Sequence, residues 1–201
     1  MSGILTDNIG RSSGLVKAAG GGGAWNIIGT SVASDSASLT ITGLDSTYGT
    51  FAIALSDLVP STDNVTAWIR FGDSGGIDSG ASDYAWLFGG DRIINASMTP
   101  AGEMDDADAQ IKLNNHAGTG GVGSAAGEGL GAFFTLNRPG DGTTYPNICG
   151  TLTNIGTVPY ISVFHVGAAR LSAITLDRIQ FLFSSGNVAT GRLTVWGIAH
   201  A

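Results

Sequence analysis

Three aspartates within four residues form the densest carboxylate cluster of this 201-residue chain. They are Asp105, Asp106 and Asp108, and Glu103 lies just before them. Hard cations such as Ca²⁺ bind several oxygen ligands at once, so the cluster is a candidate cation site. It lacks the glycine and the closing glutamate of an EF-hand loop. The alternative is a solvated acidic loop, because runs of like charge usually face water.

Other residue types that could do chemistry stand in unsuitable contexts. His116, His165 and His200 are too far apart in sequence for a metal-ligand spacing. The segment Gly-Asp-Ser-Gly-Gly at 72–76 is similar to the nucleophile segment of serine proteases, but no histidine precedes it. Glycan cleavage needs two carboxyl groups on rigid elements, whereas most acids here fall in predicted loops. We therefore expect no catalytic residue, no cofactor and no enzymatic activity.

Two aromatic residues are candidates for contact with a glycan or another receptor. Tyr84 and Trp86 are two residues apart in a predicted strand, which places both rings on the same side. Aromatic faces stack on sugar rings, and these side chains also carry a polar edge. A place in the core or at a subunit interface is the alternative interpretation.

The elements that would position these residues are strands. Apolar and small or polar residues alternate with a period of two in 37–42, 51–56 and 65–71. These runs are 12–14 residues apart with turn residues between them, as in a β-sandwich. No helical periodicity extends beyond about two turns. Further predicted strands are 25–30, 84–88, 92–96, 110–114, 132–136, 148–152, 160–166, 174–184 and 191–198. The pattern predicts an all-β, antiparallel β-sandwich.

Long connections rich in glycine and aspartate separate the strands at 71 and 132. Half of the residues from Gly118 to Gly131 are glycine, which favours functional loops or loosely ordered tips. We expect these loops to gather at one end of the sandwich, and tolerated surface insertions are the alternative. Near the C-terminus, 177–198 predicts two strands joined at Gly186-Asn187.

Residues 1–24 differ from the rest. Four consecutive glycines, Gly20, Gly21, Gly22 and Gly23, predict a flexible hinge between a short peptide and the sandwich at 25–201. The peptide can dock on a partner by adding a strand or by placing Ile4, Leu5, Leu15 and Val16 in apolar grooves. An N-terminal strand folded on its own domain is the alternative. The predicted docking residues are Ile4, Leu5, Asp7, Asn8, Arg11, Leu15, Val16 and Lys17.

Composition excludes some partners. The formal net charge of −7 disfavours nucleic acid and anionic membranes, and no apolar run is long enough to insert into a membrane. Charged residues make up only 12% of the chain, about half of the usual share. Such a composition suits a surface covered by other protein. Cys149, the single cysteine, is expected to be a small buried hydrophobe.

Three stretches resemble small structural proteins of tailed bacteriophages, and together the resemblance spans most of the chain. They are 5–18, 68–84 and 184–198. The resemblance implies a fibre, spike or decoration protein of the virion, assembled in the host cytoplasm, with a jelly-roll sandwich and no catalytic residues. It also implies a homotrimer whose N-terminus faces the particle.

The predicted function is therefore that of a virion structural protein. Its expected partners are other copies of itself, further virion proteins of the capsid, tail or collar, and a host surface glycan. A capsid decoration protein that stabilises the shell is the main alternative, and a glycan-binding or glycan-cleaving protein is a further one.

Overall fold

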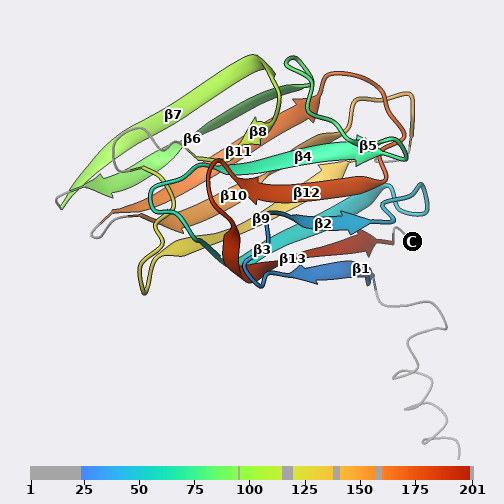
Figure 1. The fold of residues 1–201 in the computed structure, drawn as a ribbon. Helices are drawn as coiled ribbons and strands as arrows, with labels where there is room; N and C mark the ends of the chain where they lie inside the picture. The colour runs from blue at the N-terminus through green and yellow to red at the C-terminus, as the bar shows by residue number, and fades with distance from the viewer. Residues whose placement is uncertain (1–23, 95, 115–119, 138–140, 157–159, 200–201) are drawn as a thin grey trace, which may run out of the picture.

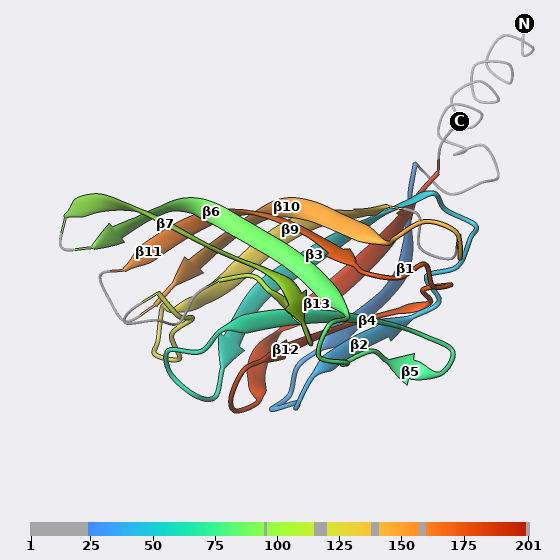
Figure 2. The same ribbon diagram turned by 90° about the horizontal axis from the view of Figure 1, so that it is seen from above.

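The computed structural model describes residues 24–94, 96–114, 120–137, 141–156 and 160–199. Thirteen strands and no helix occur within these ranges. They form two antiparallel sheets that face each other as two layers (Figures 1 and 2). The predicted all-β, antiparallel sandwich is confirmed. Within the same ranges, no helix is long and apolar enough to cross a membrane.

The larger sheet has eight strands in the order β1-β13-β3-β9-β10-β11-β6-β7. Their bounds, in that order, are Trp25–Val32, Val188–Ile198, Thr50–Pro60, Gly129–Asn137, Asn147–Ile155, Ile161–Arg170, Tyr84–Ile94 and Ser97–Asp108.

The smaller sheet has the order β2-β12-β4-β5, with β8 paired to β4. The bounds are Leu39–Thr42 for β2, Arg178–Phe183 for β12, Ala67–Asp73 for β4, Gly76–Ile77 for β5 and Ile111–Lys112 for β8. Early and late strands interleave in both sheets. Thus β13 lies between β1 and β3, and β12 lies between β2 and β4.

The core forms between the sheets because the apolar residues of each strand face inward at every second position. Phe51 and Ile53 from the larger sheet, and Ile69, Phe71 and Phe181 from the smaller one, are completely buried. The alternation that predicted strands at 37–42, 51–56 and 65–71 therefore marks the inner faces correctly.

The last two strands, β12 and β13, differ from the prediction of a strand pair. They are not hydrogen-bonded to each other, because β12 belongs to the smaller sheet and β13 to the larger. Gly186, with φ of 71°, lies in the turn that carries the chain from one layer to the other. Both strands have an alternating pattern, so each turns its apolar side toward the shared core from the opposite layer.

The segment predicted as an acidic loop also differs. Residues Ser97–Asp108 form β7, which pairs with β6 over most of its length at the edge of the larger sheet. In addition, β6 is one continuous strand where two short strands were predicted. An edge strand has only one neighbouring strand and buries few side chains. Its sequence therefore lacks the apolar alternation from which a strand could have been predicted.

The glycine-rich connections lie at both ends of the sandwich, so the prediction that they gather at one end is wrong. The turn after β4 lies at the end where β1 begins, whereas residues 120–128 lie at the opposite end, beside the connection from β3 to β4 (Figure 1). There Gly121 donates to the side chain of Asn64. The protease-like segment 72–76 comprises the end of β4, the tight turn at 74–75 and the first residue of β5.

The N-terminal predictions fall outside the described residues. This applies to the anchoring arm at 1–24 apart from Ala24, to the docking residues Ile4, Leu5, Asp7, Asn8, Arg11, Leu15, Val16 and Lys17, and to the hinge glycines Gly20, Gly21, Gly22 and Gly23. It applies also to His116 and His200.

Candidate interaction surface

Tyr84 and Trp86, the predicted receptor contacts, lie in the interior. Both side chains lie on the same side of β6, as their spacing predicted. That side faces the core, and their exposed fractions are 0% and 3%. The Trp86 ring stacks on Phe88 with 5.8 Å between centroids. In this conformation neither ring offers a face to a sugar, so their burial supports the core interpretation.

The hydroxyl of Tyr84 completes the backbone pairing of β4. It accepts a hydrogen bond from the backbone N–H of Phe71 at 2.8 Å. Its own proton lies within reach of the backbone carbonyls of Phe71, at 3.1 Å, and Asp78, at 3.0 Å. Burial raises the pKa of the Tyr84 hydroxyl, because a phenolate would lose its hydration there. The side chain thus substitutes for a neighbouring strand.

Arg170 binds the chain segment that precedes β6. Its guanidinium group lies over the Tyr84 ring, 5.7 Å from the centroid. It forms ion pairs with Asp78 at 3.0 Å and Asp83 at 3.1 Å. The guanidinium also donates to the backbone carbonyl of Asp83. These contacts fix the connection between β5 and β6 and have a structural role.

The acidic cluster does not gather its oxygens at one point. Asp105 lies opposite Trp86 in the ladder, and its carboxylate accepts from the backbone N–H of Ala107. Asp108 accepts from the indole N–H of Trp86 at 3.1 Å and forms an ion pair with Lys112 at 3.2 Å.

A β-bulge separates the members of the cluster further, because Asp106 and Ala107 both lie opposite Ala85. In the parts of the chain that the structure describes, no group of three His, Cys, Asp or Glu could hold a metal ion. The predicted cation site at Asp105, Asp106 and Asp108 is therefore not formed.

Cys149 contradicts the expectation of burial. It is exposed on the outer face of β10, while its neighbours Ile148 and Leu152 face the core. Its sulfur lies 3.3 Å from the hydroxyl of Thr135 on β9. The outer face that it shares with His165 carries the main surface feature of the molecule.

One end of this outer face carries an aromatic ridge, which consists of Trp25, Phe133 and Trp196. Trp25 stacks on Phe133 with 6.0 Å between centroids and meets Trp196 edge-on at 6.1 Å. The rings lie across the sheet because the outward residues of β3 beneath them are Ala52 and Ala54. Trp25 is still 50% exposed and Phe133 42%.

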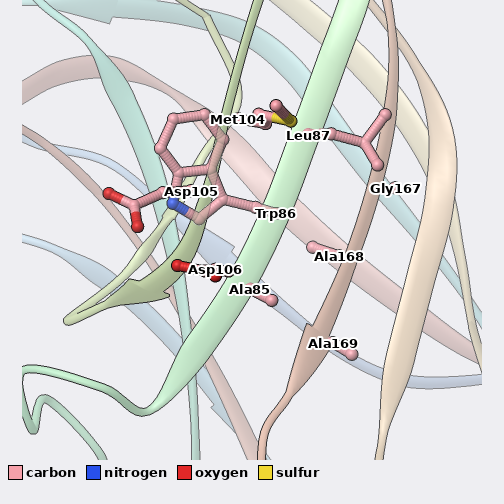
Figure 3. A pocket seen from close by; sticks show the side chains of 9 residues that line it. All are labelled: Ala85, Trp86, Leu87, Met104, Asp105, Asp106, Gly167, Ala168 and Ala169. Atoms are coloured by element: carbon pink, nitrogen blue, oxygen red, sulfur yellow. The ribbon is translucent and has the colours of Figure 1, made fainter.

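The other end carries an apolar hollow of about 790 Å³ between β6, β7 and β11 (Figure 3). Its lining comprises Ala85, Trp86, Leu87, Met104, Asp105, Asp106, Gly167, Ala168 and Ala169. Outward positions with little or no side chain form the floor, and a Cβ placed at Gly167 would meet nothing within 4 Å. Leu87 and Met104 stand beside it and are 58% and 80% exposed.

Three rows of outward residues cross all or nearly all of the sheet between these ends. Each row follows the paired residues from strand to strand across the sheet. The first row consists of Trp25, Ile198, Thr50, Asn137, Asn147, Ala169 and Ala85, and the second of Ile27, Trp196, Ala52, Thr135, Cys149, Gly167, Leu87 and Met104. The third row consists of Thr30, Thr194, Ala54, Phe133, Thr151, His165, Gly89 and Gly102. His165 and Cys149 are the only ionisable side chains among them. We call these rows the uncharged face.

Sequence reasoning did not find this face, because its members come from eight strands that alternation cannot order. The alternation within single strands did carry a signal. Trp196 and Cys149 each come directly after a core residue of their strand, so their side chains had to point to the outer face.

The comparison with known proteins finds no relative. No protein-family model matches the chain, and no curated protein or solved structure does so.

Proposed function

We propose that this chain is a non-enzymatic structural protein of a tailed-bacteriophage virion, a fibre or spike component that assembles as a homotrimer. The N-terminal segment 1–24 attaches it to the particle. The resemblance of residues 5–18, 68–84 and 184–198 to phage structural proteins motivates the assignment to a virion. The interleaved strand order supports a jelly-roll description of the sandwich, since that fold places early strands beside late ones in two Greek keys.

The observation that carries the structural role is the uncharged face. The aromatic ridge and the apolar hollow are exposed apolar patches at its two ends, and uncharged polar or small residues lie between them. Large exposed apolar patches mark contacts with other proteins. In this acidic chain no carboxylate lies within the three rows, and Asp106 lies at the bulge in β7 where the first row ends. A surface of this kind suits a building block of an assembly.

A capsid decoration protein is the second candidate, because a broad uncharged sheet face would also pack against a shell. The two functions differ in where the protein sits on the particle. Contact with a host glycan through Tyr84 and Trp86 has no support from their burial.

Gold-labelled antibody against the chain, applied to purified particles of the phage that encodes it, tests the proposal. Labelling of fibres or spikes is expected. Uniform labelling of the shell would favour the decoration protein, and particles without any labelled chain would refute a virion role.

Deleting residues 2–19 tests the attachment segment separately. The shortened chain is expected to keep the oligomeric mass of the full chain and to be missing from purified particles. A shortened chain that no longer folds would show that the segment belongs to the domain. One that still joins the particle would show that attachment lies elsewhere.

A further inference from the structure

We infer that the uncharged face is where copies of this chain join, with the aromatic ridge of one copy packed into the apolar hollow of the next. The inference rests on the self-assembly in the proposed function, but not on attachment to a particle. Three observations support a second copy as the occupant: the shape of the two ends, the distribution of charge and the available area.

The two ends of the face are complementary in shape and chemistry. The ridge offers three aromatic rings, two of them about half exposed. The hollow is floored by glycine and alanine and bordered by Leu87 and Met104, with Asp105 and Asp106 also in its lining. Aromatic side chains seated in apolar pockets, and methionine sulfur near aromatic rings, are favourable contacts. Both parts of the contact are present on every copy.

The charge distribution selects a copy of the same chain over a charged partner. Each copy has a formal net charge of −7, so two copies repel wherever their carboxylates meet. The uncharged face is a surface on which they can meet without that repulsion. A strongly charged partner would find no ion-pairing carboxylate, lysine or arginine within the three rows, and the nearest carboxylates are Asp105 and Asp106 at the hollow.

The outer face of the smaller sheet lacks this character. Arg70 donates to Gln110 there, and Arg178 forms an ion pair with Asp177 at 2.6 Å. Lys112 is likewise paired, with Asp108. That face is a charged, internally paired surface of the kind that faces water.

The area of the uncharged face leaves room for a contact with a neighbouring copy at each end. Strands lie about 4.8 Å apart, and residues on one side of a strand repeat every ~6.8 Å. Three rows across eight strands therefore cover roughly 800 Å². In a ring each copy divides this area between two neighbours, so each contact covers roughly 400 Å² of one copy, at the small end of specific protein interfaces. Because the ridge and the hollow are different patches, the contact runs head to tail, and such contacts form a ring when the rotation between copies closes, here after three copies.

Paired aspartate substitutions test the inference in the full chain. Trp25→Asp changes the ridge and Met104→Asp changes the border of the hollow. Each has a control on its own strand, exposed to a similar degree or more but outside the three rows: Val32→Asp for the ridge and Met98→Asp for the hollow. Circular dichroism and thermal melting confirm that all four variants fold.

The expected result, measured by light scattering at several concentrations, is a wild-type trimer of about 61 kDa, three times the 20.3 kDa chain. Trp25→Asp and Met104→Asp each weaken assembly at least ~30-fold, as expected for the loss of a central contact. The controls assemble like wild type. Mixing the two variants restores one intact contact and gives a species of twice the chain mass.

The thiol of Cys149, midway between ridge and hollow, gives a second readout. Maleimide should label it at least ten times more slowly in the assembled wild type than in either monomeric variant. Equal labelling rates would show that the centre of the face is uncovered and would overturn the inference.

The other outcomes separate the two proposals. A wild-type monomer at every concentration would refute self-assembly and this inference together. A wild-type oligomer unaffected by Trp25→Asp and Met104→Asp would refute only the assigned surface. Variants that dissociate but do not recombine on mixing would refute the packing of the ridge into the hollow.

Discussion

Replacing Tyr84 with phenylalanine tests the role of a buried hydroxyl as a substitute for a strand. The ring would keep its packing, but the backbone N–H of Phe71 would lose its acceptor. The carbonyl of Phe71 would keep a donor, because the N–H of Asp78 also binds it at 2.8 Å. One orphaned buried donor and one lost hydrogen bond together cost about 2–3 kcal/mol.

A change of that size lowers the melting temperature by roughly 4–12 °C for a chain of this length. Differential scanning calorimetry at matched protein concentration measures the shift, since self-association would make the melting temperature depend on concentration. Tyr145→Phe is the control, because Tyr145 is 52% exposed, and it should melt within about 1 °C of wild type.

The pH dependence of the unfolding free energy provides an independent test of the role of Tyr84. The raised pKa of Tyr84 in the fold means that the unfolded chain loses the phenol proton first, from about pH 10 upward. The contribution of Tyr84 is therefore complete below pH ~10 and falls by about 1.4 kcal/mol per pH unit above it. The difference in unfolding free energy between wild type and Tyr84→Phe should narrow between pH 9 and 11.

Two results would refute this reasoning. A Tyr84→Phe variant that melts like Tyr145→Phe at pH 8 would show that Phe71 does not depend on the hydroxyl. A difference that stays constant from pH 9 to 11 would show that Tyr84 does not titrate differently in the folded and unfolded states.

Three further predictions concern the same sandwich. Gly90→Ala should lower the unfolding free energy measured in urea by about 1–3 kcal/mol, because its Cβ would lie 2.0 Å from the backbone oxygen of Val163. Gly89→Ala, with nothing within 4 Å, is the control and should be nearly neutral; similar losses for both would contradict the close approach. Arg170→Met should cost about 1–3 kcal/mol in the same assay by leaving its two aspartates without their cation, and a wild-type midpoint would contradict that. EDTA should move the melting temperature by less than about 1 °C, since the carboxylates of 105–108 do not gather around one point. A drop of many degrees would instead support a bound cation at this cluster.

The strands of the core could be predicted from the sequence because their burial repeats with period two. Phe51 and Ile53 in β3 show this pattern plainly. Membership of a sheet could not be predicted, because alternation marks which side of a strand is apolar but not which layer the strand joins. For that reason β12 and β13 were expected to pair, although each faces the core from a different sheet.

The surface was harder to predict than the core. The residues of β7 are at least partly exposed, so the strand carries no apolar alternation. Its backbone pairing with β6 stabilises it, and its composition gives no sign of that pairing. Gly89 and Gly90 look like a break in β6, yet Gly90 is where a side chain would collide with β11. The ridge joins Trp25, Phe133 and Trp196, which only the strand order brings together.

The interleaved strand order also constrains how the chain can fold during synthesis. β12 separates β2 from β4, and β13 separates β1 from β3, so neither sheet can close until residues 178–198 have emerged from the ribosome. The apolar sides of the earlier strands must wait for these late partners. Folds dominated by such distant pairings form in milliseconds to seconds, and their intermediates expose unpaired strand edges. The yield of folded protein in cells should therefore depend strongly on chaperone supply and growth temperature. The stability of the folded protein should depend on them less.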